Sequence, residues 1–96
     1  MRVTSRGYRG HREILASEDS VCRLLSEYPA MFGLETSDHS YIFRDNGAIT
    51  GFLHLVHPGH IIVHSYPEKR QIYVDVFAFE KRLDKSRIEN DLRQRF

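Results

Sequence analysis

The segment between residues 57 and 79 constrains the fold most, because it contains two β-strand patterns separated by a short polar break at residues 67–70. In residues 60–66 the side chains alternate between the two faces of a strand. One of these faces carries His60, Ile62, His64 and Tyr66. The second pattern, residues 71–79, is β-branched and aromatic, and both of its faces are largely apolar. Such a strand needs cover on both sides, which predicts the centre of a sheet in a layered fold.

The segment before this pair predicts a strand and a helix. Residues 13–16 are a short apolar piece and are predicted to form the first strand. Ser17 is a predicted N-cap, and apolar residues at helical spacing follow it. They are Val21, Leu24, Leu25 and Tyr28. Pro29 and Gly33 are predicted to end this amphipathic helix.

Two further strands and a second helix complete the set. Residues 40–43 and 49–56 flank Asn46-Gly47, a dipeptide typical of tight hairpins, so both are predicted to be strands. Residues 81–96 carry apolar residues at i, i+4 and i+8, which predicts a closing helix with a narrow apolar stripe.

The resulting order is β-α-β-β-β-β-α, which predicts an α+β fold. We expect a two-layer α/β sandwich in which an antiparallel sheet carries two helices on one face. Residues 1–96 are expected to form a single domain, with the basic residues 1–12 frayed; a phosphate-binding arm is the alternative for that segment. The other face of the sheet would be apolar and open, so we expect a homodimer or a higher oligomer formed through it.

The composition disfavours several classes of partner. The 96 residues carry a formal net charge of +1 with mixed signs, which gives no strong field toward nucleic acid or a membrane surface. Cys22 is the single cysteine and cannot form an internal disulfide, which fits a reducing compartment. The sequence contains no apolar run of membrane length. We therefore expect a cytoplasmic protein that binds neither membranes nor nucleic acid.

Four histidines lie within the eleven residues from 54 to 64, namely His54, His57, His60 and His64. Imidazole is the commonest zinc ligand, so a metal site is one hypothesis. A type II turn at Pro58-Gly59 would place His57 opposite His60. His54 would then point to the other face, and no cysteine or carboxylate completes a set of ligands. No metal is therefore expected. An active-site role as hydrogen-bonding groups is favoured for His60 and His64, and ordinary polar residues at a sheet opening are an equal alternative.

The same segment resembles a known family. Residues 64–68, His-Ser-Tyr-Pro-Glu, and residues 74–77, Val-Asp-Val-Phe, are similar to the core of the prokaryotic-type S-adenosylmethionine decarboxylase proenzymes. In that family a turn serine attacks the preceding carbonyl, and the chain cuts itself to leave an N-terminal pyruvoyl group. The resemblance implies the same sandwich fold. It also implies a dimer in which two such sheets pack together, with sites near the interface.

The sequence departs from this family at two positions that carry its chemistry. Gly59 stands where the family has the serine, and glycine has no hydroxyl for the acyl shift or the elimination. The family's cysteine, implied as the proton donor in turnover, falls at Phe79, or at Ala78 if the alignment slips by one residue. We therefore expect a divergent member that forms no pyruvoyl group and uses no cofactor.

The resemblance also implies residues that bind substrate. Glu68 would accept hydrogen bonds from ribose hydroxyls or lie near a sulfonium cation, and a solvated loop acid is the alternative. Tyr66 and Phe43 would stack on the adenine and the sulfonium, and core aromatics are the alternative. His64 and His60 are the candidate catalytic residues.

Three functions follow from these observations, and they leave open whether the chain is an enzyme. The favoured one is a protein that binds S-adenosylmethionine or a methylthioadenosine-like ligand without self-processing, as a regulatory or partner subunit connected with polyamine (spermidine) biosynthesis. The second is a lyase that cleaves S-adenosylmethionine to methylthioadenosine without a prosthetic group. The third is a structural or interaction module that kept the fold alone.

Overall fold

The two central strands have the predicted alternation. In the computed structural model, β4 (Gly59–Tyr66) and β5 (Gln71–Ala78) pair antiparallel along their whole length, and a 3₁₀ turn at Pro67–Lys69 connects them. Every second side chain of the pair is buried on one face. These buried residues are Ile61, Val63, Ser65, Ile72, Val74, Val76 and Ala78. The other face of β4 carries His60, Ile62, His64 and Tyr66, so the predicted alternation of residues 60–66 is confirmed.

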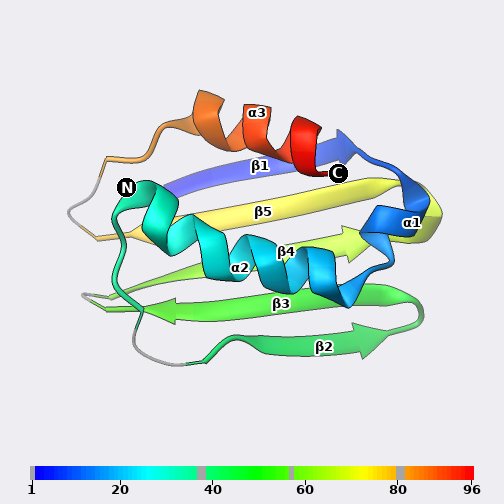
Figure 1. Cartoon of the computed structure of the whole chain (residues 1–96), viewed down its shortest axis with the longest axis horizontal. Coiled ribbons are helices and arrows are strands. Elements are labelled where there is room, and N and C mark those ends of the chain that lie inside the picture. The colour runs from blue at the N-terminus through cyan, green and yellow to red at the C-terminus, as the bar shows by residue number, and fades with distance from the viewer. Residues whose placement is uncertain (1, 37–38, 57, 80–81) are drawn as a thin grey trace.

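The structure describes residues 2–36, 39–56, 58–79 and 82–96. For residues 6–8 it describes the backbone and not the side chains. The other elements in these ranges are β1 (Arg2–Arg9), α1 (Arg12–Leu15), α2 (Glu18–Phe32), β2 (Tyr41–Asp45), β3 (Ala48–Leu55) and α3 (Lys85–Arg95). The five strands form one antiparallel sheet in the order β1-β5-β4-β3-β2, and the helices lie on one side of it (Figure 1). The predicted α+β sandwich is confirmed.

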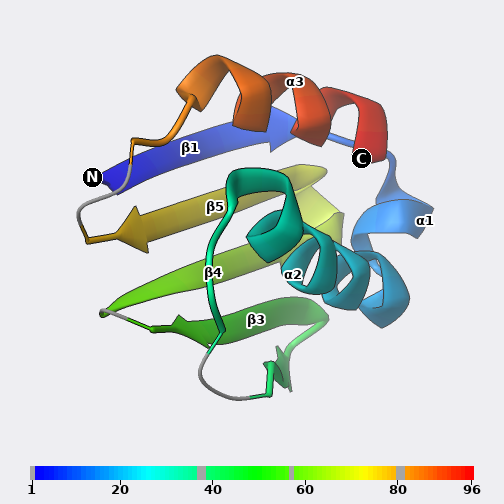
Figure 2. The same ribbon diagram turned by 60° about the vertical axis from the view of Figure 1, so that its left-hand side comes forward.

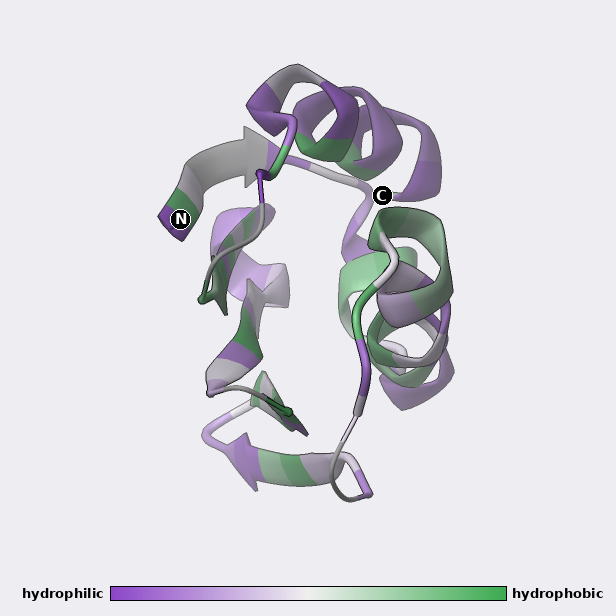
Figure 3. Ribbon diagram, turned by 90° about the vertical axis from the view of Figure 1, so that its left-hand side faces the viewer, coloured by the Kyte–Doolittle hydropathy of each residue, from purple (hydrophilic) through white to green (hydrophobic). Residues whose placement is uncertain are grey.

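The core lies between the sheet and helices α2 and α3. Helix α2 crosses the central strands and α3 runs beside β1 (Figure 2). Viewed edge-on, the sheet and the helices form two layers (Figure 3). Helix α2 buries the stripe predicted from its spacing, which is Val21, Leu24, Leu25 and Tyr28. Gly51 on β3 lets α2 approach closely, because a Cβ at this position would lie 2.7 Å from Val21 Cγ1.

The ends of α2 follow the sequence signals in part. Ser17 Oγ accepts a hydrogen bond from the Ser20 N–H at 3.3 Å, as an N-cap does, and Gly33 ends the helix with a φ of 65°. Pro29 does not end it, because the helix continues to Phe32 with the proline ring buried in the core. Among the helices that the structure describes, none is long and apolar enough to cross a membrane.

The N-terminal part of the prediction was wrong in two places. Residues Arg2–Arg9, expected to be frayed, form the edge strand β1, which pairs with β5 from Arg2 opposite Phe77 to Arg9 opposite Gln71. Residues 13–16, expected to be the first strand, lie in α1 and its C-cap. Strand β1 buries Val3 and Ser5 on the helix side, and the arginines around them hid this alternation.

The hairpin between β2 and β3 is confirmed. Asn46 has a φ of 49° and Gly47 a φ of 82°, so both central residues adopt the left-handed conformation that a two-residue type I′ turn needs. The strands pair from Tyr41 opposite Phe52 to Asp45 opposite Ala48. This turn therefore fixes the register of the edge strand β2.

A polar link joins α2 to α3 beside the core. Tyr28 is fully buried, and its hydroxyl donates a hydrogen bond to Asp91 Oδ2 at 2.6 Å. Arg95 donates to both carboxylate oxygens of Asp91, at 3.0 and 3.1 Å, and pairs with Glu27 at 3.0 Å. Burial, together with the bond to Asp91, raises the pKa of the Tyr28 phenol well above its usual range, so the hydroxyl remains a donor.

We expect Tyr28→Phe to lower the free energy of unfolding by about 1.5–3 kcal/mol, because a partly buried carboxylate loses a donor while the ring stays packed. Urea unfolding followed by circular dichroism measures this change. Ser26→Ala on the exposed side of α2 is the control and should change the value by less than about 0.5 kcal/mol. An unfolding midpoint for Tyr28→Phe equal to that of the control would contradict the prediction.

Candidate functional site

The side of the sheet opposite the helices, which we call the open face, carries polar and aromatic side chains in rows across the strands. One row contains Arg2, Phe77, His60 and His54. The next contains Thr4, Asp75, Ile62, Phe52 and Tyr41. A third contains Tyr73, His64, Thr50 and Phe43. All described helices pack on the other side of the sheet, so these rows face away from the helical layer (Figure 2).

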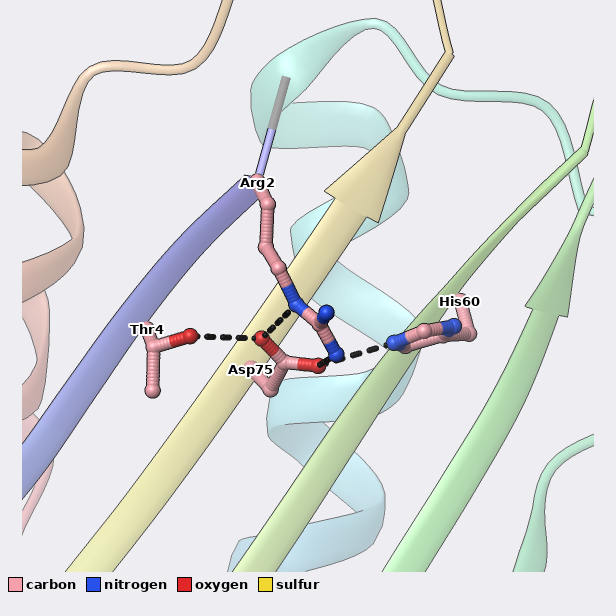
Figure 4. Close-up of polar contacts among 4 residues, drawn as sticks. All are labelled: Arg2, Thr4, His60 and Asp75. Carbon is pink, nitrogen blue, oxygen red and sulfur yellow. Dashed lines mark hydrogen bonds and ion pairs between the residues drawn. The ribbon is translucent and has the colours of Figure 1, made fainter.

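Asp75 lies at the centre of these rows and contacts three side chains (Figure 4). Arg2 donates from Nε to Oδ1 at 3.0 Å and from Nη2 to Oδ2 at 2.9 Å, and Thr4 Oγ1 donates to Oδ1 at 2.7 Å. His60 Nε2 lies 2.8 Å from Oδ2. The hydrogen bonds from Arg2, with those from His60 and Thr4, hold the pKa of Asp75 well below its usual range. The carboxylate is therefore ionised.

His60 is held between aromatic rings from the two neighbouring strands. Its ring stacks on Phe52 of β3 with a centroid distance of 6.1 Å and lies 5.9 Å from the ring of Phe77 on β5. Phe52 also meets the edge of His54 at 4.6 Å. These four residues, with Arg2, Pro58 and Gly59, line a hollow in the open face. His60 therefore contacts Asp75 through one ring nitrogen and borders this hollow.

His64 lies further along β4 and borders a second hollow. Its Nδ1 lies 3.1 Å from Thr50 Oγ1, and its ring stacks on Tyr66 with a centroid distance of 6.3 Å. The second hollow has a volume of about 720 Å³, which is within the usual range of small-molecule sites. It is lined by Arg2, Thr4, Ile62, His64, Tyr73, Val74 and Asp75. Arg2 lines both hollows. Its partner Asp75 lies opposite Ile62, which separates His60 from His64 on β4, so the Arg2–Asp75 pair lies between the two histidines.

The structure brings some of the predicted site residues together and separates others. His60, His64 and Tyr66 share the open face, as predicted, and Tyr66 also meets the ring of Tyr73 edge to face at 5.4 Å. Phe43 lies at the margin of this face on the edge strand β2 and lines neither hollow. Glu68 lies in the 3₁₀ turn beyond β4, where it is exposed and accepts a hydrogen bond from Arg12 at 2.6 Å.

The predicted arrangement of the other histidines was wrong. His54 lies directly opposite His60 and on the same face, because Leu55 pairs with Gly59. Gly59 is the first residue of β4 and does not adopt the positive φ that the third position of a type II turn needs. His57 lies outside the described residues. Among the residues that the structure describes, no three histidine, cysteine or carboxylate side chains are grouped to hold a metal ion.

Sequence reasoning assigned no role to Arg2, Thr4 or Asp75, although Asp75 lies in the segment 74–77 that carries the family resemblance. Asp75 is the only carboxylate in an otherwise apolar and aromatic strand pattern, residues 71–79. A charge in such surroundings is costly unless it is paired, so this residue was detectable in principle. Arg2 and Thr4 gave no such signal, because their segment does not have the apolar alternation of a strand.

Position 59, which the resemblance aligns with the turn serine of the family, has no room for a side chain on this backbone. A Cβ built on Gly59 would lie 2.4 Å from the backbone oxygen of Phe77, so any side chain here requires the backbone of β5 to move. The Phe79 N–H donates to the Pro58 carbonyl at 3.3 Å and Ala78 pairs with Gly59, so both candidates for the family's cysteine position lie beside the turn. The two family positions are therefore neighbours, but neither residue present supplies a hydroxyl or a thiol.

We expect Arg2→Gln to raise the pKa of Asp75 toward its usual value, because the charge-assisted hydrogen bonds from the guanidinium are lost. A depressed carboxyl pKa stabilises the fold above about pH 4, and this stability is lost as the pH falls. Acid unfolding of Arg2→Gln should therefore begin at a higher pH than that of the wild type. Circular dichroism measures the midpoint, and Arg44→Gln, which removes an exposed ion pair with Glu18, is the control. Equal midpoints for the wild type and Arg2→Gln would contradict this expectation.

Comparison with known proteins agrees with these features. A search of curated proteins gives no match to the chain. The family model for S-adenosylmethionine decarboxylase matches residues 2–96, a range that includes every described strand and helix from β1 to α3. The chain therefore belongs to the S-adenosylmethionine decarboxylase family.

Proposed function

We propose that this family member binds S-adenosylmethionine or methylthioadenosine on its open face and forms no pyruvoyl group. The observation that carries the proposal is Gly59, which has no hydroxyl and lies against the backbone of Phe77 with no space for a side chain. Without that group the chain lacks the electron sink on which decarboxylation depends. It retains the surface around it, with His60 and His64 on the same strand face.

Several groups on the open face suit this ligand. The rings of Tyr66 and Tyr73 offer an aromatic surface on which adenine and a sulfonium cation are stabilised. Arg2 donates hydrogen bonds to Asp75 from Nε and Nη2. Its guanidinium has further N–H donors, and these suit the carboxylate of the methionine moiety. These interactions account for both ends of S-adenosylmethionine.

Glu68 and Phe43 are proposed to contribute from the margins of the site. Arg12 donates a hydrogen bond to Glu68 Oε1. Among the described residues, none donates a hydrogen bond to Oε2, so this oxygen is proposed to accept one from a ribose hydroxyl. Phe43, in the row of His64, is proposed as a second stacking surface. A protein that binds the ligand without converting it would act as a regulatory or partner subunit.

Intact mass spectrometry of the purified protein tests the first half of the proposal. We expect one species at the full-length mass, apart from loss of Met1, because self-processing needs a hydroxyl or thiol after the scissile bond. Two fragments that separate between Pro58 and Gly59, the second with a keto-acid cap, would overturn it.

Isothermal titration with S-adenosylmethionine and with methylthioadenosine tests the second half. His64→Ala and Glu68→Gln should each weaken binding about tenfold, the usual effect of losing one hydrogen bond to a ligand. Ser26→Ala on the helix side is the control and should bind like the wild type. Unchanged titrations of both site variants would place the ligand elsewhere. Release of methylthioadenosine from S-adenosylmethionine would show a lyase, and no binding of either compound would favour a structural module.

We also propose that the open face forms the interface of a homodimer. Large apolar side chains are exposed on or beside this face, with Phe43 61%, Phe79 53% and Tyr41 43% exposed. A small domain seldom leaves such a surface uncovered. The aromatic rows on two copies would cover each other, and the hollows would then lie near the interface.

Phe43→Asp should shift the protein from dimer to monomer, because it places a charge in the proposed apolar interface. Sedimentation velocity at tens of micromolar measures the mass of each variant. Ala30→Asp introduces the same charge on exposed helix α2 and should leave the dimer intact. A wild-type protein that is monomeric over the whole concentration range would count against the interface.

A further inference from the structure

We infer that His60 and Asp75 form an acceptor pair, in which Asp75 holds the Nε2–H of His60 and the lone pair on His60 Nδ1 accepts a hydrogen bond from a hydroxyl or ammonium group of the ligand. His60 contacts the ligand, and Asp75 is a positioning residue that acts through it. The pair itself follows from the geometry of the open face, and the identity of the ligand rests on the proposed function.

The contact with Asp75 determines the tautomer of neutral His60. His60 Nε2 lies 2.8 Å from Asp75 Oδ2, which is a hydrogen-bond distance. The carboxylate is ionised beside Arg2 and can only accept, so the proton of this bond belongs to Nε2. Nδ1 therefore carries a lone pair whenever the imidazole is neutral.

The neighbouring rings and the carboxylate's other partners fix this arrangement. Phe52 and Phe77 flank the imidazole, and its side chain is only 24% exposed. Arg2 and Thr4 hold Asp75, so the carboxylate cannot turn away without losing their hydrogen bonds. No other described residue makes a hydrogen bond to Nδ1. The acceptor is thus preorganised by its neighbours.

The groups around the hollow that His54 and His60 line favour a ligand that donates a hydrogen bond. Both Asp75 oxygens are already engaged by Arg2, Thr4 and His60, so they offer little to a ligand. The other ionisable side chains that line this hollow are Arg2, which can only donate, and His54. A neutral His54 also has one acceptor nitrogen, but His60 Nδ1 is the one whose lone pair is fixed by a carboxylate partner, and a hydroxyl or an ammonium group complements it.

The tautomer can be measured directly with ¹⁵N-labelled protein. Long-range ¹H–¹⁵N correlation spectra at neutral pH should show His60 protonated at Nε2. In Asp75→Asn the amide can donate to Nε2, so the ring should change to the Nδ1–H tautomer. Asp19→Asn makes the same chemical change on exposed α2 and should leave the His60 spectrum as in the wild type. An Nδ1–H tautomer in the wild type would overturn the acceptor pair. An Nε2–H tautomer that persists in Asp75→Asn would overturn it as well.

Ligand titrations distinguish the two kinds of donor. Methylthioadenosine has ribose hydroxyls and no ammonium group, whereas S-adenosylmethionine has both. Asp75→Asn and His60→Phe should each weaken binding about tenfold for both compounds if a hydroxyl is the donor, and for S-adenosylmethionine alone if the ammonium is. Binding of both compounds that neither variant weakens, with no shift of the wild-type Nδ1 resonance, would overturn the acceptor role. The expected tautomer without binding of either compound would support the pair and overturn the proposed function.

Discussion

The pairing of β4 with β5 is the constraint on which the rest of the molecule depends. Side chains alternate with a period of two, so a slip of one residue would exchange the buried face and the open face of both strands. At one end of the pair the backbones of the two strands come very close. This register is possible because residue 59 is glycine. The helix side then collects the apolar residues that α2 and α3 cover. The open face collects His60, His64, Tyr66, Tyr73 and Asp75 from these two strands.

The charge of Asp75 organises the open face in turn. A carboxylate among aromatic and β-branched side chains is stable only with donors around it. Those donors come from β1 and β4, the two neighbours of β5 in the sheet. The N-terminal strand therefore contributes both to the core and to the surface that is proposed to bind the ligand. Loss of β1 would leave a half-buried charge without its strongest partner.

The sequence predicted the elements with strong local signals and missed those that depend on long-range contacts. The N-cap at Ser17 and the hairpin at Asn46-Gly47 follow from local chemistry and were correct. Strand β1 was missed because its stability comes from pairing with β5, about 70 residues away in the chain. The face of His54 was assigned wrongly because it depends on where the turn before Gly59 ends, and a shift of one residue inverts the answer.

The candidate site shows the same division. Strand alternation was enough to place His60, His64 and Tyr66 on one face. The ion pair of Glu68 with Arg12 and the cluster around Asp75 join segments that are far apart in the sequence, and local patterns carry little information about such contacts. The resemblance to the family identified position 59, but the lack of space there is a property of the packed strands.

The tight contact at Gly59 also bears on how such a chain can evolve. A serine at this position would bring its Cβ against the backbone of the neighbouring strand, and a backbone atom cannot be displaced as the end of a flexible side chain can. Introducing a hydroxyl at position 59 therefore requires an accompanying change in β5. A chain with this strand packing does not gain a side chain at position 59 by one substitution without disturbing β5, so single substitutions are accommodated more readily on the open face.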